Sequence, residues 1–167
     1  MYTSFQNISD KARIWVYQAN RMILSEESVL IEDRMKSFIE QWTAHGNQLY
    51  ASAKVTEDYF LMVALDENVS QASGCSIDAS VHFIQELQHS MNIDFFDRTK
   101  VVLEIGNDRI QQDLGEVAEA IKSGKIEPTV STYNNLISYK EQLTSEWKIP
   151  LRNSWLKKYF SQKNTIA

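Results

Sequence analysis

The sequence predicts an α+β protein with a ferredoxin-like core, in which an antiparallel βαββαβ sheet carries two helices on one face and is followed by a C-terminal helical extension. Two observations predict this class. Segments with the period-two alternation of strands and segments with helical period follow one another in that order, and 167 residues are enough for one buried core. We expect the core to span residues 1–112, with residues 113–167 packed on it as an extension of the same structural unit.

The first half of the predicted core contains a strand, a helix and a hairpin. Residues 13–18 alternate and are rich in aromatic and β-branched side chains, which favours a strand. Ser25 and the two acids after it are typical of a helix start, and Gly46 is typical of a helix end. The apolar positions between them recur at helical spacing and are Ile31, Met35, Phe38 and Trp42. Residues 49–55 and 59–65 then predict a hairpin.

The second half of the core repeats the helix and adds strands. Helical period returns at Ile77 and ends near Asn92, and residues 101–105 and 109–112 predict a strand and a short return strand. In the extension we expect a helix over residues 114–121, which Gly124 ends. A last amphipathic piece follows, with a shared apolar face formed by Leu151, Trp155 and Tyr159.

The two central strands set the expected geometry. In a ferredoxin-like sheet the strands at 13–18 and 59–65 are parallel neighbours. Both segments are apolar on both faces, so the face opposite the helices must also be covered. We expect the C-terminal third or a second subunit to cover it.

Charge is distributed unevenly along the chain. The net charge is −5, but residues 138–167 carry six Lys/Arg and two Asp/Glu, which leaves −9 on residues 1–137. The acidic balance of this larger part argues against a nucleic-acid-binding core. The longest uncharged apolar run, residues 59–65, is too short to span a bilayer, and the first ten residues lack the pattern of a secretory signal. With a single cysteine as well, the sequence predicts a cytoplasmic protein without a membrane span.

The candidate ligand site follows from the predicted parallel strands. The loops after them, residues 20–24 and 66–76, emerge at the same end of the sheet, where a helix N-terminus favours an anion. A phosphate or carboxylate ligand would be held there by Arg21, Ser73, Gly74, Cys75, Ser76 and Asp78. In the alternative interpretation Ser76 or Asp78 caps the helix, Gly74 permits the turn and Cys75 is a small buried apolar residue.

The sequence supports catalysis and metal binding less than it supports the anion site. A Cys75 nucleophile would need a base, and the predicted fold places His45 at the opposite end of the sheet. His82, Glu86 and His89 have the spacing of metal ligands on a helix, but they lie opposite its apolar face, which favours a solvated surface. We therefore predict no metal site and no cofactor.

The basic and aromatic tail, residues 140–160, offers a candidate interaction surface. Its members are Trp147, Trp155 and Tyr159. The alternative is that these rings pack as the apolar side of a half-buried helix, because they alternate with lysines at helical spacing.

Several segments carry a resemblance to a known family. SGCSIDAS (Ser73–Ser80), DFFDR (Asp94–Arg98) and the pair Trp147 and Trp155 around Ile149 and Pro150 resemble an uncharacterised family of small bacterial cytoplasmic proteins. Some members of that family are labelled ABC transporter ATPases. This chain has no GxxxxGK[ST] phosphate loop, so we predict no ATP hydrolysis. Residues 111–133 also resemble GYF-related modules, which implies a peptide-docking element.

These observations favour a non-catalytic binding or protein-interaction module, whose partner is a second copy of the chain or another protein. The alternative is an enzyme or a small-anion binding protein with its site between the loops of Arg21 and Cys75.

Overall fold

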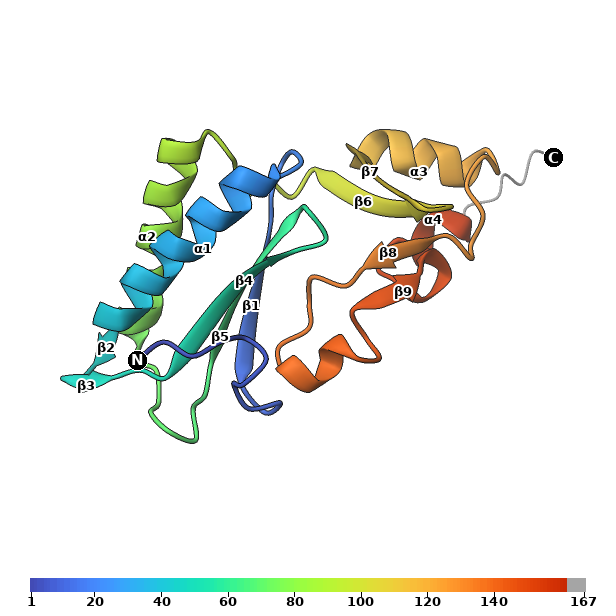
Figure 1. Ribbon diagram of the computed structural model, residues 1–167. Coiled ribbons are helices and arrows are strands. Elements are labelled where there is room, and N and C mark those ends of the chain that lie inside the picture. The colour runs from blue at the N-terminus through green and yellow to red at the C-terminus, as the bar shows by residue number, and fades with distance from the viewer. Residues whose placement is uncertain (162–167) are drawn as a thin grey trace. The chain divides into compact units, whose positions relative to one another are not determined.

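The computed structural model describes residues 1–161 of the chain and is an α+β structure with three antiparallel sheets in that range (Figure 1). Its strands are β1 (Arg13–Gln18), β2 (Thr43–Ala44), β3 (Asn47–Gln48), β4 (Ala51–Thr56), β5 (Phe60–Leu65), β6 (Lys100–Ile105), β7 (Asp108–Asp113), β8 (Ser131–Tyr133) and β9 (Lys148–Pro150). Its helices are α1 (Ser25–Gln41), α2 (Gly74–Met91), α3 (Leu114–Lys122) and α4 (Lys157–Phe160), with 3-10 turns η1 (Lys140–Leu143) and η2 (Leu151–Asn153).

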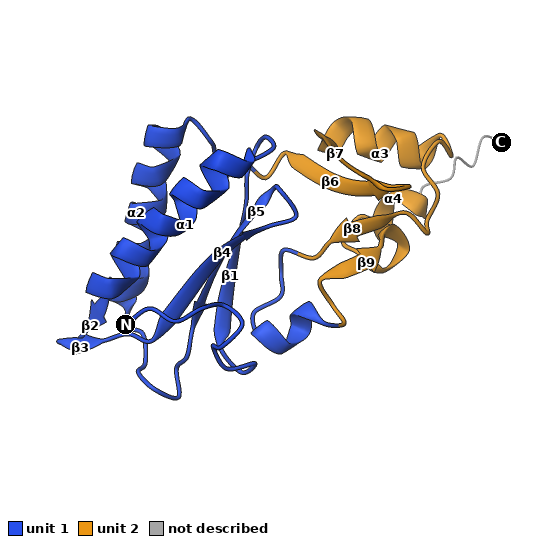
Figure 2. Ribbon diagram, viewed as in Figure 1, with its two compact units in different colours: residues 1–97, 135–144 blue, residues 98–134, 145–167 orange. Residues whose placement is uncertain are grey.

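The chain forms two compact units (Figure 2). Unit 1 comprises Met1–Asp97 and Asn135–Thr144, and unit 2 comprises Arg98–Asn134 and Ser145–Ala167, of which the last six residues lie outside the described range. The division therefore does not follow the boundary that we expected at residue 112. It falls before β6, and a segment from the C-terminal third returns to unit 1.

The sheet of unit 1 has the strand order β1-β5-β4. The predicted neighbours β1 and β5 do pair, with Val16 opposite Met62, but they run antiparallel. The predicted parallel pair is therefore wrong. The ferredoxin-like order is not found either, because β6 belongs to the sheet of unit 2. Alternation and apolar runs identify strands, but they look the same in both chain directions and do not specify partners.

Both faces of the central strand β5 are buried, which agrees with its apolar character. On one face Leu61 packs in a core shared with α1 and α2, which lie side by side over the sheet (Figure 1). On the other face Phe60 and Met62 are completely buried. The Phe5 ring lies on that side too, 4.4 Å from the Nζ atom of Lys54, which is the cross-strand neighbour of Met62. The N-terminal segment therefore contributes to covering the second face.

The returning segment, Asn135–Thr144, is joined to β1 and to the residues before it. The Ile14 amide donates to the Ser138 carbonyl at 2.8 Å, and the Lys140 amide donates to the Ala12 carbonyl at 2.9 Å. The side-chain amide of Asn135 donates to the Gln18 side chain at 2.9 Å. This part of the C-terminal third thus covers the edge of β1 that does not face β5. It supplies hydrogen-bond partners for backbone groups that an edge strand would otherwise leave unpaired.

Unit 2 has a sheet with the strand order β7-β6-β8-β9 and the helix α3. The predicted strand, return strand and helix of this region are confirmed as β6, β7 and α3. Its apolar core unites Leu103, Val117, Ile121, Leu151 and Leu156. The last two residues come from the C-terminal segment, which is therefore part of this core and not a separate amphipathic helix.

Candidate functional site

The structure does not bring Arg21 and Cys75 together. The Arg21 guanidinium donates to the carbonyls of Met91 at 3.1 Å and Asn92 at 3.3 Å, at the C-terminal end of α2. Cys75 lies in the first turn of the same helix. An α-helix of 18 residues is about 27 Å long, so the two side chains lie at opposite ends of it. The predicted site between their loops is wrong, because β1 and β5 are antiparallel and those loops leave opposite ends of the sheet.

Arg21 is instead paired with Glu27 in the first turn of α1. Its two terminal nitrogens donate to the two carboxylate oxygens at 2.8 Å each. The Leu24 amide donates to the same carboxylate at 3.0 Å. The hydrogen bond from Arg21 is the largest cause that lowers the pKa of Glu27 to about 2. Arg21 therefore links the start of α1 to the end of α2.

The remaining residues of the predicted anion site form the start of α2. Ser73 is the N-cap: its hydroxyl accepts from the Ser76 amide at 3.1 Å, and the Ser76 hydroxyl accepts from the Ser73 amide at 2.8 Å. The capping interpretation thus applies, with Ser73 in place of the expected Ser76 or Asp78. Cys75 and Asp78 are exposed, so the expected burial of the thiol is also wrong. Gly74 does not have the positive φ that would require glycine.

The end of α1 lies beside the start of α2. The Trp42 indole Nε1 donates to the Ser76 carbonyl at 2.8 Å, and β2, which precedes His45, packs against α2. The expectation that His45 and Cys75 lie at opposite ends of the sheet is therefore wrong. It depended on the ferredoxin-like topology, in which the two helices are placed differently.

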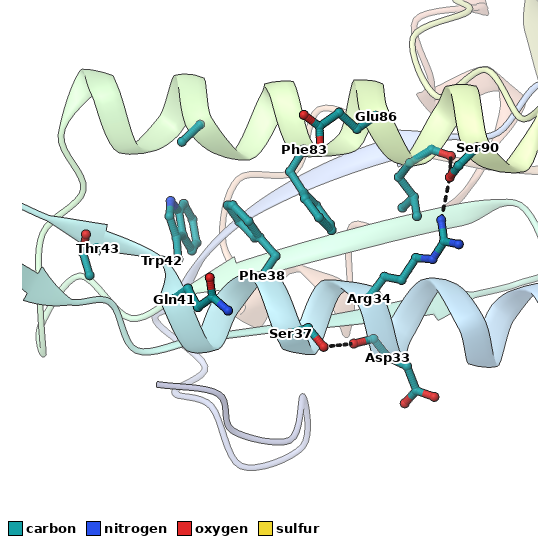
Figure 3. Close-up of a pocket in the computed structure, with 12 residues that line it drawn as sticks. Asp33, Arg34, Ser37, Phe38, Gln41, Trp42, Thr43, Phe83, Glu86 and Ser90 are labelled. Carbon is teal, nitrogen blue, oxygen red and sulfur yellow. Dashed lines mark hydrogen bonds between the residues drawn. The ribbon is translucent and has the colours of Figure 1, made fainter.

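The antiparallel helices α1 and α2 enclose a groove on their outer side (Figure 3). Its volume is about 830 Å³. Its lining residues are Asp33, Arg34, Ser37, Phe38, Gln41, Trp42, Thr43, Ala79, Phe83, Glu86, Leu87 and Ser90. The groove lies wholly within unit 1.

Aromatic rings line the centre of the groove. Phe38 of α1 and Phe83 of α2 stack with their centroids 4.6 Å apart and their planes 15° apart. Trp42 lies next to Phe38, with the two ring centroids separated by 5.5 Å. Trp42 is buried, whereas both phenylalanines are partly exposed. The phenylalanine pair therefore presents an apolar surface to solvent inside the groove.

Polar groups surround this aromatic centre. At one end the Arg34 guanidinium donates to the Ser90 hydroxyl at 2.6 Å, which bridges the two helices (Figure 3). The carboxylates of Asp33 and Glu86 are exposed, and that of Asp33 points away from α2 (Figure 3). An apolar centre with a polar rim is the usual anatomy of a recognition surface.

The groove was not predicted from the sequence, although its residues follow a simple rule. Ala79, Phe83, Glu86 and Ser90 are spaced by four, three and four residues, which places them on one stripe of α2. Phe38 had been assigned to the buried face of α1. The signal that could have indicated the groove is Phe83, a large ring that falls outside the apolar stripe of Ile77, Val81 and Ile84.

The histidines of α2 do not gather into a metal site. His82, Glu86 and His89 are exposed, and the His89 Nδ1 atom lies 2.6 Å from the Gln85 carbonyl. Among residues 1–161, no three His, Cys, Asp or Glu side chains come together as metal ligands would.

The predicted aromatic surface of the tail is divided between core and solvent. Trp147 is buried, with its ring 5.0 Å from that of Tyr133, so it does not belong to an exposed surface. Trp155 is 45% exposed. Tyr159 is half-buried, and the Nζ atoms of Lys122 and Lys158 lie 5.5 and 5.1 Å from its ring.

Comparison with protein-family models, curated proteins and solved structures gives no match for this chain. Over the described residues, no helix combines the length and apolarity that crossing a bilayer demands.

Proposed function

We propose that this protein is a non-catalytic interaction module and that the groove between α1 and α2 is its binding site. The observation that carries the proposal is the stacked pair Phe38 and Phe83, which is partly exposed inside a groove. Aromatic rings in a concave, polar-rimmed site contribute a large share of binding energy at protein interfaces.

The dimensions of the groove favour a short helical partner segment. On α1 the groove extends from Asp33 to Gln41, and nine residues of helix cover about 13 Å, which is two and a half turns. Two adjacent helices leave a furrow along their axes, and an amphipathic helix fills such a furrow with side chains spaced by three and four residues.

The charge of the two helices favours a basic partner. The helix α1 carries five acidic and two basic residues, and α2 carries two acidic and no Lys or Arg residues, so their sum is −5. The one arginine of the groove, Arg34, is hydrogen-bonded to Ser90. Glu86 is exposed beside the groove, where it can meet a cation. The occupant that we infer is therefore an amphipathic helix with an apolar or aromatic anchor and flanking Lys or Arg residues.

Binding of a designed peptide tests this proposal. The probe is a synthetic helix of about three turns that contains leucine, lysine and one tryptophan. Its affinity for the full chain is measured by titration calorimetry. An environment-sensitive fluorophore on Cys75, the only cysteine of the chain, locates the binding, because Cys75 lies one turn before Ala79 on the stripe that lines the groove.

Phe83→Ala should weaken binding by about tenfold or more. The matched control is Phe96→Ala, which removes another partly exposed ring of unit 1, one that stacks edge-on with Tyr17 outside the groove. Thermal unfolding confirms that both variants are folded. Equal affinity of wild type and Phe83→Ala, or equal loss in both variants, overturns the assignment of the groove.

A further inference from the structure

Unit 2 carries an exposed tryptophan with the chemistry that the groove of unit 1 favours. Trp155 is 45% exposed, and the two lysines of α4, Lys157 and Lys158, come two and three residues after it. The Lys158 Nζ atom lies 5.5 Å from the centre of the indole. An aromatic anchor and two cations therefore stand together on one short stretch of the surface.

The backbone on both sides of Trp155 is fixed. Ser154 and Leu156 are buried, at 5% and 0% exposure. The Ser154 hydroxyl donates to the Leu151 carbonyl at 2.8 Å and accepts from the Leu156 amide at 3.1 Å. The indole is thus held outward on an ordered turn, so little conformational entropy would be lost when it binds.

The charges of the two units are complementary. Unit 1 contains seven Lys/Arg and fifteen Asp/Glu, which gives −8. Residues 145–161 contain four Lys/Arg and one Asp/Glu, which gives +3. Opposite net charges on two surfaces of the same chain favour the encounter of one copy with another.

From these observations we propose that the chain associates with a second copy of itself, and that Trp155 of one copy inserts into the α1–α2 groove of the other. The indole stacks on Phe38 and Phe83, and Lys157 and Lys158 meet the rim carboxylates, of which Glu86 is one. This inference rests on the proposed function, since it names the partner of the same groove. The contact joins two different surfaces of the protein. Two copies can therefore exchange it reciprocally in a dimer, or successive copies can repeat it head to tail in a longer assembly. One anchor and two cations make a small, salt-sensitive contact.

Sedimentation velocity of the full chain over a range of concentrations tests the inference. We expect concentration-dependent association that weakens as salt is raised. Trp155→Ala should raise the dissociation constant by about tenfold or more. Tyr139→Ala, which removes another exposed ring, is the matched control and should leave it unchanged. A wild-type chain that stays monomeric throughout overturns the inference, and so does a dissociation constant that is unchanged in Trp155→Ala.

Mixing two variants gives a more specific test. Trp155→Ala retains the groove, and Phe83→Ala retains the tryptophan, so each should fail to associate alone while an equimolar mixture forms heterodimers. No heterodimer in the mixture contradicts the proposed contact. A Cys75 fluorophore signal that depends on Trp155 but not on concentration would mean that the indole occupies the groove of its own chain, which also overturns association between copies.

The failure of this inference is distinguishable from the failure of the proposed function. If the designed peptide binds in a Phe83-dependent way and Trp155→Ala leaves self-association unchanged, the groove remains a binding site for another protein and only the second copy is wrong. If the peptide does not bind in that way, the groove assignment itself fails.

Discussion

The guanidinium of Arg21 and the carboxylate of Glu27 form a two-pronged ion pair, with both nitrogen–oxygen distances at 2.8 Å. The same guanidinium also donates to the Met91 carbonyl, at the far end of the chain's second long helix. The start of α1 and the end of α2, which are distant in sequence, therefore share one cation. The guanidinium of Arg21 therefore donates its hydrogen bonds within the fold and does not face a ligand site.

Glu27→Gln should destabilise the protein by about 1 kcal/mol at neutral pH, because paired Arg–carboxylate contacts contribute on that order. The folded pKa of Glu27, about 2, lies below its ordinary value of 4.5. Its contribution is therefore complete above pH 4.5 and is lost as the pH falls through 2. Urea unfolding at pH 7 and at acidic pH measures the difference. Glu26→Gln, an exposed neighbour, is the control, and a difference independent of pH would contradict the assignment.

Tyr17 should ionise later than the exposed tyrosines. Burial raises its pKa from 10 to about 12. Because the folded pKa is the higher one, the stability linked to neutral Tyr17 is complete below pH 10 and is lost as the pH rises through 12. An ultraviolet absorbance titration of wild type and Tyr17→Phe isolates this group. Loss of a step near or below pH 10 in Tyr17→Phe would disprove the effect of burial.

Ser52→Ala should raise the free energy of unfolding by about 1 kcal/mol, because a buried hydroxyl without a partner is costly. Within residues 1–161, the Ser52 hydroxyl is buried and has no hydrogen-bond acceptor or donor in reach. Ser80→Ala provides the comparison, since the Ser80 hydroxyl donates to the Ile77 carbonyl at 2.7 Å and its loss should destabilise slightly. Denaturant unfolding of wild type, Ser52→Ala and Ser80→Ala measures the three free energies of unfolding. A clear loss of stability in Ser52→Ala would refute the expectation.

Cys75 should react with an alkylating reagent in the folded protein nearly as fast as in the denatured chain, because its side chain is exposed. Mass spectrometry at successive times measures the rate. A variant that combines Cys75→Ser with Ala64→Cys moves the thiol to a completely buried strand position and should be protected until unfolding. Slow labelling of Cys75 itself would show that this end of α2 is covered.

The sequence predicted most elements of both units but not how the strands combine. The pairing of β1 with β5 could be predicted. Both segments lack a polar face, and strands of that kind lie inside a sheet that is covered on both faces. Their antiparallel direction could not, because apolar alternation has no polarity along the chain. The assignment of β6 to a second sheet depended on its pairing with β8, a strand of three residues with no distinct pattern.

The site was harder to predict than the fold. The groove arises where two helices meet, and helical spacing alone does not show whether Phe38 points to the sheet or to the neighbouring helix. Arg21 was assigned to an anion because its acidic partner, six residues later, falls outside the three- and four-residue spacings that predict ion pairs on a helix. The capping role of Ser73 was within reach of the sequence, since a serine three residues before Ser76 can exchange hydrogen bonds with it.

The return of Asn135–Thr144 to unit 1 has a genetic consequence. Neither unit corresponds to one continuous stretch of coding sequence. Recombination or truncation that transferred residues 1–97 alone would leave the Ile14 amide without the Ser138 carbonyl and expose the edge of β1 to other strands. A single cut in the chain therefore cannot separate the two units without removing the partner of that edge.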